Sequence, residues 1–162
     1  MCTSSQAKRT CPVLATVLLL SSHQLAAKDL LALSELLTPA YTAMNFAALC
    51  ADEPSWKAVQ PIGRRGTAIN YAEHVKDEIV GVLSYGDALT VLRSAADQAR
   101  AEARWQLQIR IKAANPNMEN ARFRMWCAEY ASSFIEAFIV EHDDRHSEFL
   151  EHLSRLSVGQ QR

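Results

Sequence analysis

Residues 125–140 read MWCAEYASSFIEAFIV, and this stretch decides how the chain can fold. In a helical conformation its apolar side chains cover nearly the whole circumference, interrupted by Glu129 and Glu136. A helix that is apolar all round is buried at the centre of a protein or meets a second protein. The stretch is too short and too charged to span a membrane, which needs about 20 apolar residues. We expect a long C-terminal helix from about Met118 to Leu156.

The preceding residues also favour helices. Alanine, leucine, glutamate, arginine and glutamine dominate, and no Asn-Gly or Asp-Gly hairpin signal lies between alternating apolar runs. Apolar residues recur at helical spacing in three segments, at about 28–50, 67–83 and 88–114, separated by a loop over 56–66 and a break at 84–87 with Asp87 as the expected N-cap. Within the first segment, Pro39 either kinks the helix or begins a second one, because proline is best tolerated in a first turn.

The first 27 residues have the order of a secretory signal peptide. Lys8 and Arg9 precede an apolar run, VLATVLLL at 13–20, and small residues end the segment at Ala27. An apolar run of about 7–15 residues in this order is typical of a signal removed after export. A buried N-terminal helix of a cytosolic protein is the alternative. We predict cleavage after Ala27, a single helical domain over 28–162, and a periplasmic or secreted location.

Cleavage there would leave two of the four cysteines, Cys50 and Cys127. Two cysteines in an oxidising compartment allow only one pairing, so we predict a disulfide between them. The bond would close a long loop, which stabilises a fold by about 4 kcal/mol in the chain-entropy account. Two buried free thiols are the alternative, because cysteine is among the most buried residue types.

The predicted disulfide also orders the helices. Cys50 lies at the end of the first predicted helix, and Cys127 lies about ten residues into the last. A bond between them places the end of the first helix beside the beginning of the last, as in an up-down-up-down four-helix bundle. We therefore predict an all-α fold, a disulfide-linked four-helix bundle. A less regular all-α array is the alternative.

The charge of the chain argues against two classes of partner. Its 17 basic side chains fall to 15 when Lys8 and Arg9 are removed, against 18 acidic ones, so the mature net charge is −3. A domain of that charge has no basic stripe for nucleic acid and no polybasic patch for a membrane surface. The sequence also contains no CxxCH, HExxH, P-loop, GxGxxG or GxSxG motif. We expect no nucleic-acid binding, no membrane insertion of the mature chain and no enzymatic activity.

A segment rich in histidine and acid, EHDDRH at 141–146, follows the apolar stretch. His142 and His146 are four residues apart and share one helix face. Two imidazoles at this spacing could bind Zn²⁺ or Cu²⁺ together with a carboxylate from elsewhere. A third ligand must come from another helix, and His74 is the only histidine of the predicted mature chain outside the last helix. A solvated helix end and a pH-responsive histidine cluster are the other interpretations.

Five residues are candidates for contacts with a protein partner. Arg64 and Arg65, between Gly63 and Gly66, predict an exposed basic turn. Trp56 either packs over the disulfide end or anchors a partner, because tryptophan is enriched at the energetic centres of interfaces. The further candidates, Trp126 and Tyr130, lie on the apolar last helix, whose face could dimerise.

The combination of export, small size and missing catalytic motifs favours one function over the others. We expect an exported helical binding protein that acts on a protein partner or on a second copy of itself, for example as an inhibitor or immunity-type protein. The alternative is a metal-binding or metal-sensing bundle that uses His142 and His146.

Overall fold

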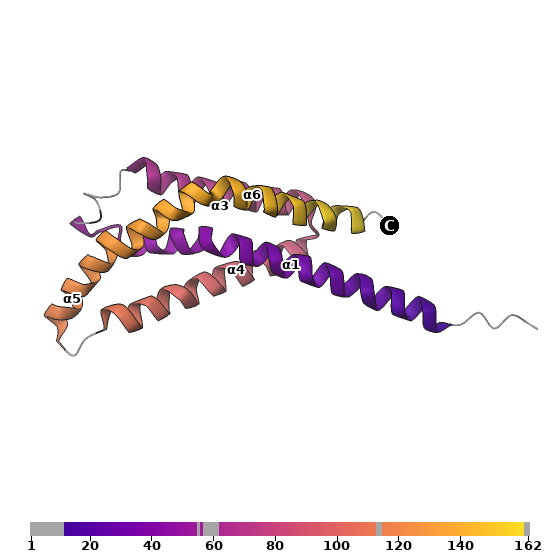
Figure 1. Ribbon diagram of the computed structural model, residues 1–162, viewed down its shortest axis with the longest axis horizontal. Helices are drawn as coiled ribbons and strands as arrows, with labels where there is room; N and C mark the ends of the chain where they lie inside the picture. The colour runs from indigo at the N-terminus through magenta and orange to yellow at the C-terminus, as the bar shows by residue number, and fades with distance from the viewer. Residues whose placement is uncertain (1–11, 55, 57–61, 113–114, 161–162) are drawn as a thin grey trace, which may run out of the picture.

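The computed structural model describes residues 12–54, 56, 62–112 and 115–160, and within these residues it contains helices and no strand (Figure 1). The helices are α1 (Pro12–Leu49), α3 (Ile62–Val82), α4 (Tyr85–Gln106), α5 (Pro116–Met125) and α6 (Ser132–Gln160). A π-helical turn, η1 (Leu107–Ile111), extends α4, and a second one, η2 (Trp126–Ala131), joins α5 to α6. Among the described residues, no helix is both long and apolar enough to cross a membrane.

The chain reverses direction from each long helix to the next. In Figure 1, α1 runs from right to left, α3 returns, α4 runs with α1, and α5 and α6 return again. Cys50 directly follows α1 and is bonded to Cys127 in η2, with the two Cα atoms 5.6 Å apart. The predicted disulfide-linked helical bundle, with the first helix joined to the last, is confirmed.

Helix α1 is the centre of the packing, because it contacts α3, α4 and α6. Its contact with α4 is the most extensive, and that face of α4 is lined mainly by alanine. Ala95 and Ala99 are fully buried there. Small side chains let two helix backbones approach closely, as the alanine spacing of this segment indicates.

The buried residues form two cores along the bundle. The disulfide-end core includes Phe46, Cys50, Trp56, Trp126, Cys127, Ile135 and Phe138. The distal core is mostly aliphatic and includes Leu33, Leu37, Val75, Ile79, Val91, Phe149 and Leu153. Tyr71 of α3 is half-buried and packs against both cores, so it lies at the junction between them.

Helix α1 continues through Pro39, so of the two alternatives at this residue the start of a new helix is wrong. Proline inside a helix removes one backbone hydrogen bond and costs about 3 kcal/mol. Leu37 and Ala40 on either side are buried, and the apolar burial of this turn offsets that cost. Glu35, whose carbonyl loses its helical donor to the proline, is exposed to water.

Two other boundaries differ from the prediction. α3 begins at Ile62, which places Arg64 and Arg65 in its first turn, so the basic turn predicted there is wrong; their side chains lie outside the described residues. α4 begins at Tyr85 with Ser84, not Asp87, as its N-cap. The Ser84 hydroxyl accepts a hydrogen bond from the Asp87 amide at 3.2 Å and donates one to the Asp87 carboxylate at 2.7 Å.

Candidate metal centre

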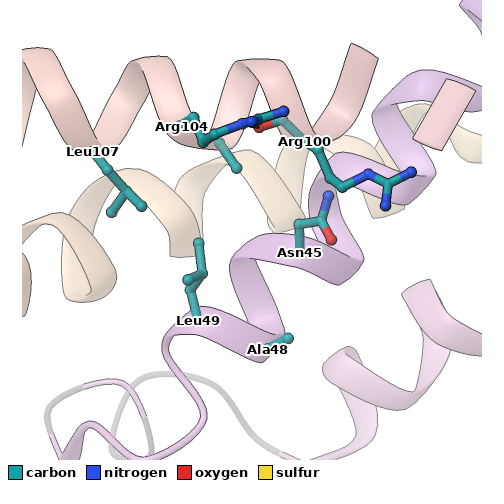
Figure 2. A pocket seen from close by; sticks show the side chains of 7 residues that line it. Asn45, Ala48, Leu49, Arg100, Arg104 and Leu107 are labelled. Atoms are coloured by element: carbon teal, nitrogen blue, oxygen red, sulfur yellow. Dashed lines mark hydrogen bonds between the residues drawn. The ribbon is translucent and has the colours of Figure 1, made fainter. Parts of the chain in front are cut away.

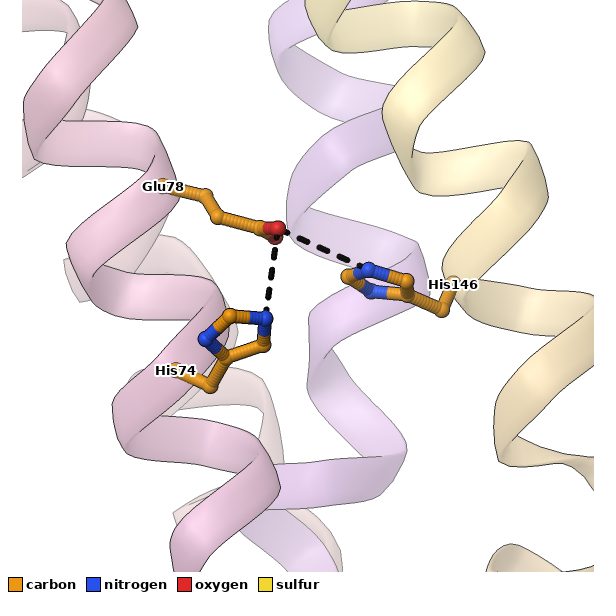
Figure 3. Close-up of side chains that lie close together, drawn as sticks. All are labelled: His74, Glu78 and His146. Atoms are coloured by element: carbon orange, nitrogen blue, oxygen red, sulfur yellow. Dashed lines mark ion pairs between the residues drawn. The ribbon is translucent and has the colours of Figure 1, made fainter.

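Two histidines and one glutamate meet between α3 and α6. His74 and Glu78 are four residues apart on α3, and His146 faces them from α6 (Figure 3). Oε1 of Glu78 lies 3.4 Å from Nε2 of His74 and 3.5 Å from Nε2 of His146. One ligand atom from each of the three residues lies within 4.8 Å of the other two.

These distances suit a shared cation better than direct hydrogen bonds. A hydrogen bond from a nitrogen to an oxygen has its heavy atoms 2.7–3.2 Å apart, which is shorter than either contact of Glu78. Ligand atoms about 2.05 Å from a tetrahedral Zn²⁺ lie about 3.3 Å from one another. Both contacts come within about 0.2 Å of that separation.

The three side chains differ in exposure. The side chain of His74 is 65% exposed, whereas those of Glu78 and His146 are 23% and 24% exposed. Oε2 of Glu78 and Nδ1 of His146 are buried and have no hydrogen-bond partner. A buried polar atom without a partner costs about 1–3 kcal/mol. A metal ion bound at Oε1 would offset the charge of the carboxylate that includes Oε2, and coordination at Nε2 would fix the tautomer of His146.

Aromatic packing holds His146 in place. Its ring stacks on Phe149 of the distal core, with the ring centroids 6.1 Å apart. It also meets the ring of Tyr71 at a centroid distance of 5.7 Å and an interplanar angle of 74°. Contacts with these two rings restrict the orientation of the imidazole, which would pre-organise it for a metal ion.

Tyr71 responds to the charge of this centre. Burial raises the pKa of its phenol to about 12, and the nearby Glu78 carboxylate adds to the rise. A cation bound at Glu78 would oppose the second of these causes, because it would neutralise the carboxylate. A change of charge at Glu78 would therefore shift the pKa of Tyr71.

The structure does not join the two histidines predicted as a pair. His142 turns back on its own helix, with Nδ1 2.6 Å from the carbonyl oxygen of Ile139 and Nε2 3.0 Å from the carboxylate of Asp143. His146 instead reaches across to α3. Sequence reasoning noticed His74 as the remaining histidine but missed Glu78, although their spacing of four residues on one helix was available as a signal.

The tryptophans considered for an interface belong to the core. Trp56 and Trp126 are buried in the disulfide-end core, which fits the interpretation that Trp56 packs over the disulfide. Tyr130 is half-buried: its hydroxyl accepts a hydrogen bond from Gln106 at 2.9 Å, and the guanidinium of Arg110 lies 4.2 Å from its ring centroid. In this arrangement neither indole ring presents a surface to a partner.

Comparison of the chain with models of protein families, with curated proteins and with solved structures found no match. The chemistry of the donor set is then the remaining guide to function. Two imidazoles and a carboxylate form a set that suits Zn²⁺, Cu²⁺ and related divalent transition ions.

Proposed function

We propose that the protein binds a divalent transition-metal ion, Zn²⁺ or Cu²⁺, between α3 and α6 through His74, Glu78 and His146. The observation that carries the proposal is the position of Oε1 of Glu78, 3.4 Å and 3.5 Å from two imidazole nitrogens. His146 keeps the role predicted for it, and His74 and Glu78 take the places of His142 and the unassigned carboxylate.

The centre would link two helices and leave room for an outside ligand. Three protein ligands leave one tetrahedral position open. Because the side chain of His74 is largely exposed, water or a small anion could reach the ion and complete its coordination. Because the ligands come from α3 and α6, binding would stabilise the contact between these helices, by about 2.7 kcal/mol at a free-ion concentration of 100 Kd.

Isothermal titration calorimetry of the metal-free protein with Zn²⁺ and Cu²⁺ tests the proposal. We expect one ion per chain, with tighter binding of Cu²⁺, as the usual order of stability for nitrogen and oxygen ligands requires. His146→Ala and Glu78→Gln should each weaken binding at least ten-fold. His142→Ala is the matched control, because it removes a histidine one turn away on the same helix, and it should bind as the wild type does.

Equal affinities in the wild type, His146→Ala and Glu78→Gln would refute the proposal. Loss of binding in His142→Ala, with His146→Ala unaffected, would also refute this ligand set. Circular dichroism of each variant shows whether the helices remain folded.

We also propose that the protein works outside the cytosol, after loss of its first 27 residues. The Cys50–Cys127 disulfide supports this location, since such bonds persist mainly in oxidising compartments. Mass spectrometry of the protein recovered from the periplasm or the culture medium should find a chain that begins at Lys28. Recovery of a chain that retains Cys2 and Cys11 would contradict the processing. Binding of a protein partner stays a prediction.

A further inference from the structure

A groove between α1 and α4 lies apart from His74, Glu78 and His146. It lies between the end of α1 and the end of α4 and has a volume of about 420 Å³, within the range of small-molecule sites (Figure 2). The residues that line it are Asn45, Ala48, Leu49, Arg100, Ala103, Arg104 and Leu107. No acidic side chain is among them.

The groove has apolar side chains at one end and polar side chains at the other. Figure 2 shows Leu49 and Leu107 facing each other at one end, while Arg100 and the amide of Asn45 lie together at the other. The side chain of Leu49 remains partly exposed, although a large aliphatic side chain is stabilised by burial. A ligand with an apolar body and a polar head would match both ends.

The positive charges of Arg100 and Arg104 favour a ligand with an anionic head group. Arg104 has no acidic partner among the described residues, and its Nε donates to the carbonyl of Arg100 at 3.4 Å. Arg100 pairs with Asp97 at 2.7 Å, and the two side chains are 59% and 72% exposed. An exposed ion pair is weak because water screens it, so a carboxylate that also gains apolar contacts can compete with Asp97.

We propose that this groove binds a free medium-chain carboxylate, with its alkyl chain between Leu49 and Leu107 and its carboxylate at Arg100 and Arg104. The groove spans about two turns of α4, which is too short for a partner helix that would need about 800 Å² of contact on each side. A small amphiphile fits that length.

Calorimetry on the full-length chain, freed of metal by a chelator, tests the proposal with three probes. Octanoate should bind, whereas acetate lacks the apolar body and octyltrimethylammonium has the wrong charge, so neither should bind detectably. Arg100→Gln and Arg104→Gln should each weaken octanoate binding about two- to five-fold. Arg93→Gln, on the same helix but outside the groove, is the matched control and should change nothing.

Two further variants make opposite changes. Ala48→Trp fills the groove and should abolish binding, while Asp97→Asn frees Arg100 and should strengthen it. If Ala48→Trp fails to fold, the variants of the exposed arginines and of Asp97 still decide the question. Absence of octanoate binding would overturn the proposal, and so would binding that none of the Arg100, Arg104 and Asp97 variants alters. These outcomes do not depend on the metal centre, which the chelator empties.

Discussion

The two cores of the bundle are held together by different means. The disulfide-end core contains a covalent bond, two π-helical turns and a group of aromatic rings around Phe46. The distal core consists mainly of leucine, isoleucine, valine and alanine, and polar side-chain contacts join its helices at the edge. The first core is fixed by a covalent bond within the chain, whereas the proposed ion would bind beside the second.

The difference explains where a metal would matter. The disulfide already joins the end of α1 to η2. No described covalent bond ties α3 to the other helices, and its contact with α4 is slight. A metal at His74, Glu78 and His146 would supply the missing link at the junction of the two cores.

Removal of one large ring from each core should give the largest effects. Phe46 and Phe149 are both almost completely buried, and Phe→Ala in a core costs about 3–5 kcal/mol. Phe46 also contacts the rings of Trp126, Tyr130 and Phe134, at centroid distances of 4.9, 5.9 and 5.1 Å. Denaturant unfolding should therefore find Phe46→Ala less stable than Phe149→Ala by about 1 kcal/mol. The reverse order would contradict the contrast between the cores.

Reduction of the disulfide should come next. Loss of a bond that closes a loop of this length lowers the free energy of unfolding by about 2–5 kcal/mol. Unfolding of the oxidised and reduced protein under otherwise equal conditions measures the difference. The double variant Cys50→Ala, Cys127→Ala is the control, because a reductant should leave its stability unchanged. An unaltered midpoint in the reduced wild type would mean that packing alone holds this end.

A polar contact at the distal end should have a smaller effect. Asp29 of α1 accepts from Nδ1 of His152 on α6 at 2.9 Å, and both side chains are less than one fifth exposed. Asp29→Asn should lower the free energy of unfolding by about 1 kcal/mol. Glu73→Gln, which breaks the exposed pair with Lys76, should lower it by clearly less than Asp29→Asn does, because water screens an exposed ion pair. Equal losses in the two variants would show that burial of the Asp29 contact adds nothing.

The smallest effect at neutral pH belongs to Tyr71. Its pKa is raised to about 12, so its contribution to stability is complete below pH 10 and is lost as the pH rises toward 12. Tyr71→Phe should remove this alkaline loss of stability and leave the stability at pH 7 nearly unchanged.

Bound metal should also shift the ultraviolet titration of Tyr71 to lower pH, because the ion would neutralise the Glu78 carboxylate. A titration unchanged by metal would place the ion elsewhere.

Local signals in the sequence were enough to predict most of the fold. Spacing of apolar residues predicts the helices, and the two cysteines outside the predicted signal peptide predict the bond between first and last helix. The sequence left a kink or a new helix open at Pro39, because the local cost of the proline is known, whereas the burial that offsets it depends on the packed neighbours of α1.

The candidate site needed information that a single helix does not contain. Spacing shows that His142 and His146 share a face of α6, but which of them reaches Glu78 on α3 depends on the rotation of one helix against the other. His142 is bound to its own helix by the carbonyl of Ile139, and His146, one turn later, is level with Glu78. Only the packed structure distinguishes these two histidines.

Anomalous X-ray diffraction at the zinc absorption edge, from crystals grown with Zn²⁺, tests the central claim most directly. The account predicts one strong peak between α3 and α6, about 2.0–2.2 Å from Nε2 of His74, Nε2 of His146 and a carboxylate oxygen of Glu78. A zinc-saturated crystal without a peak at that position, or with its strongest peak at His142, would contradict the account.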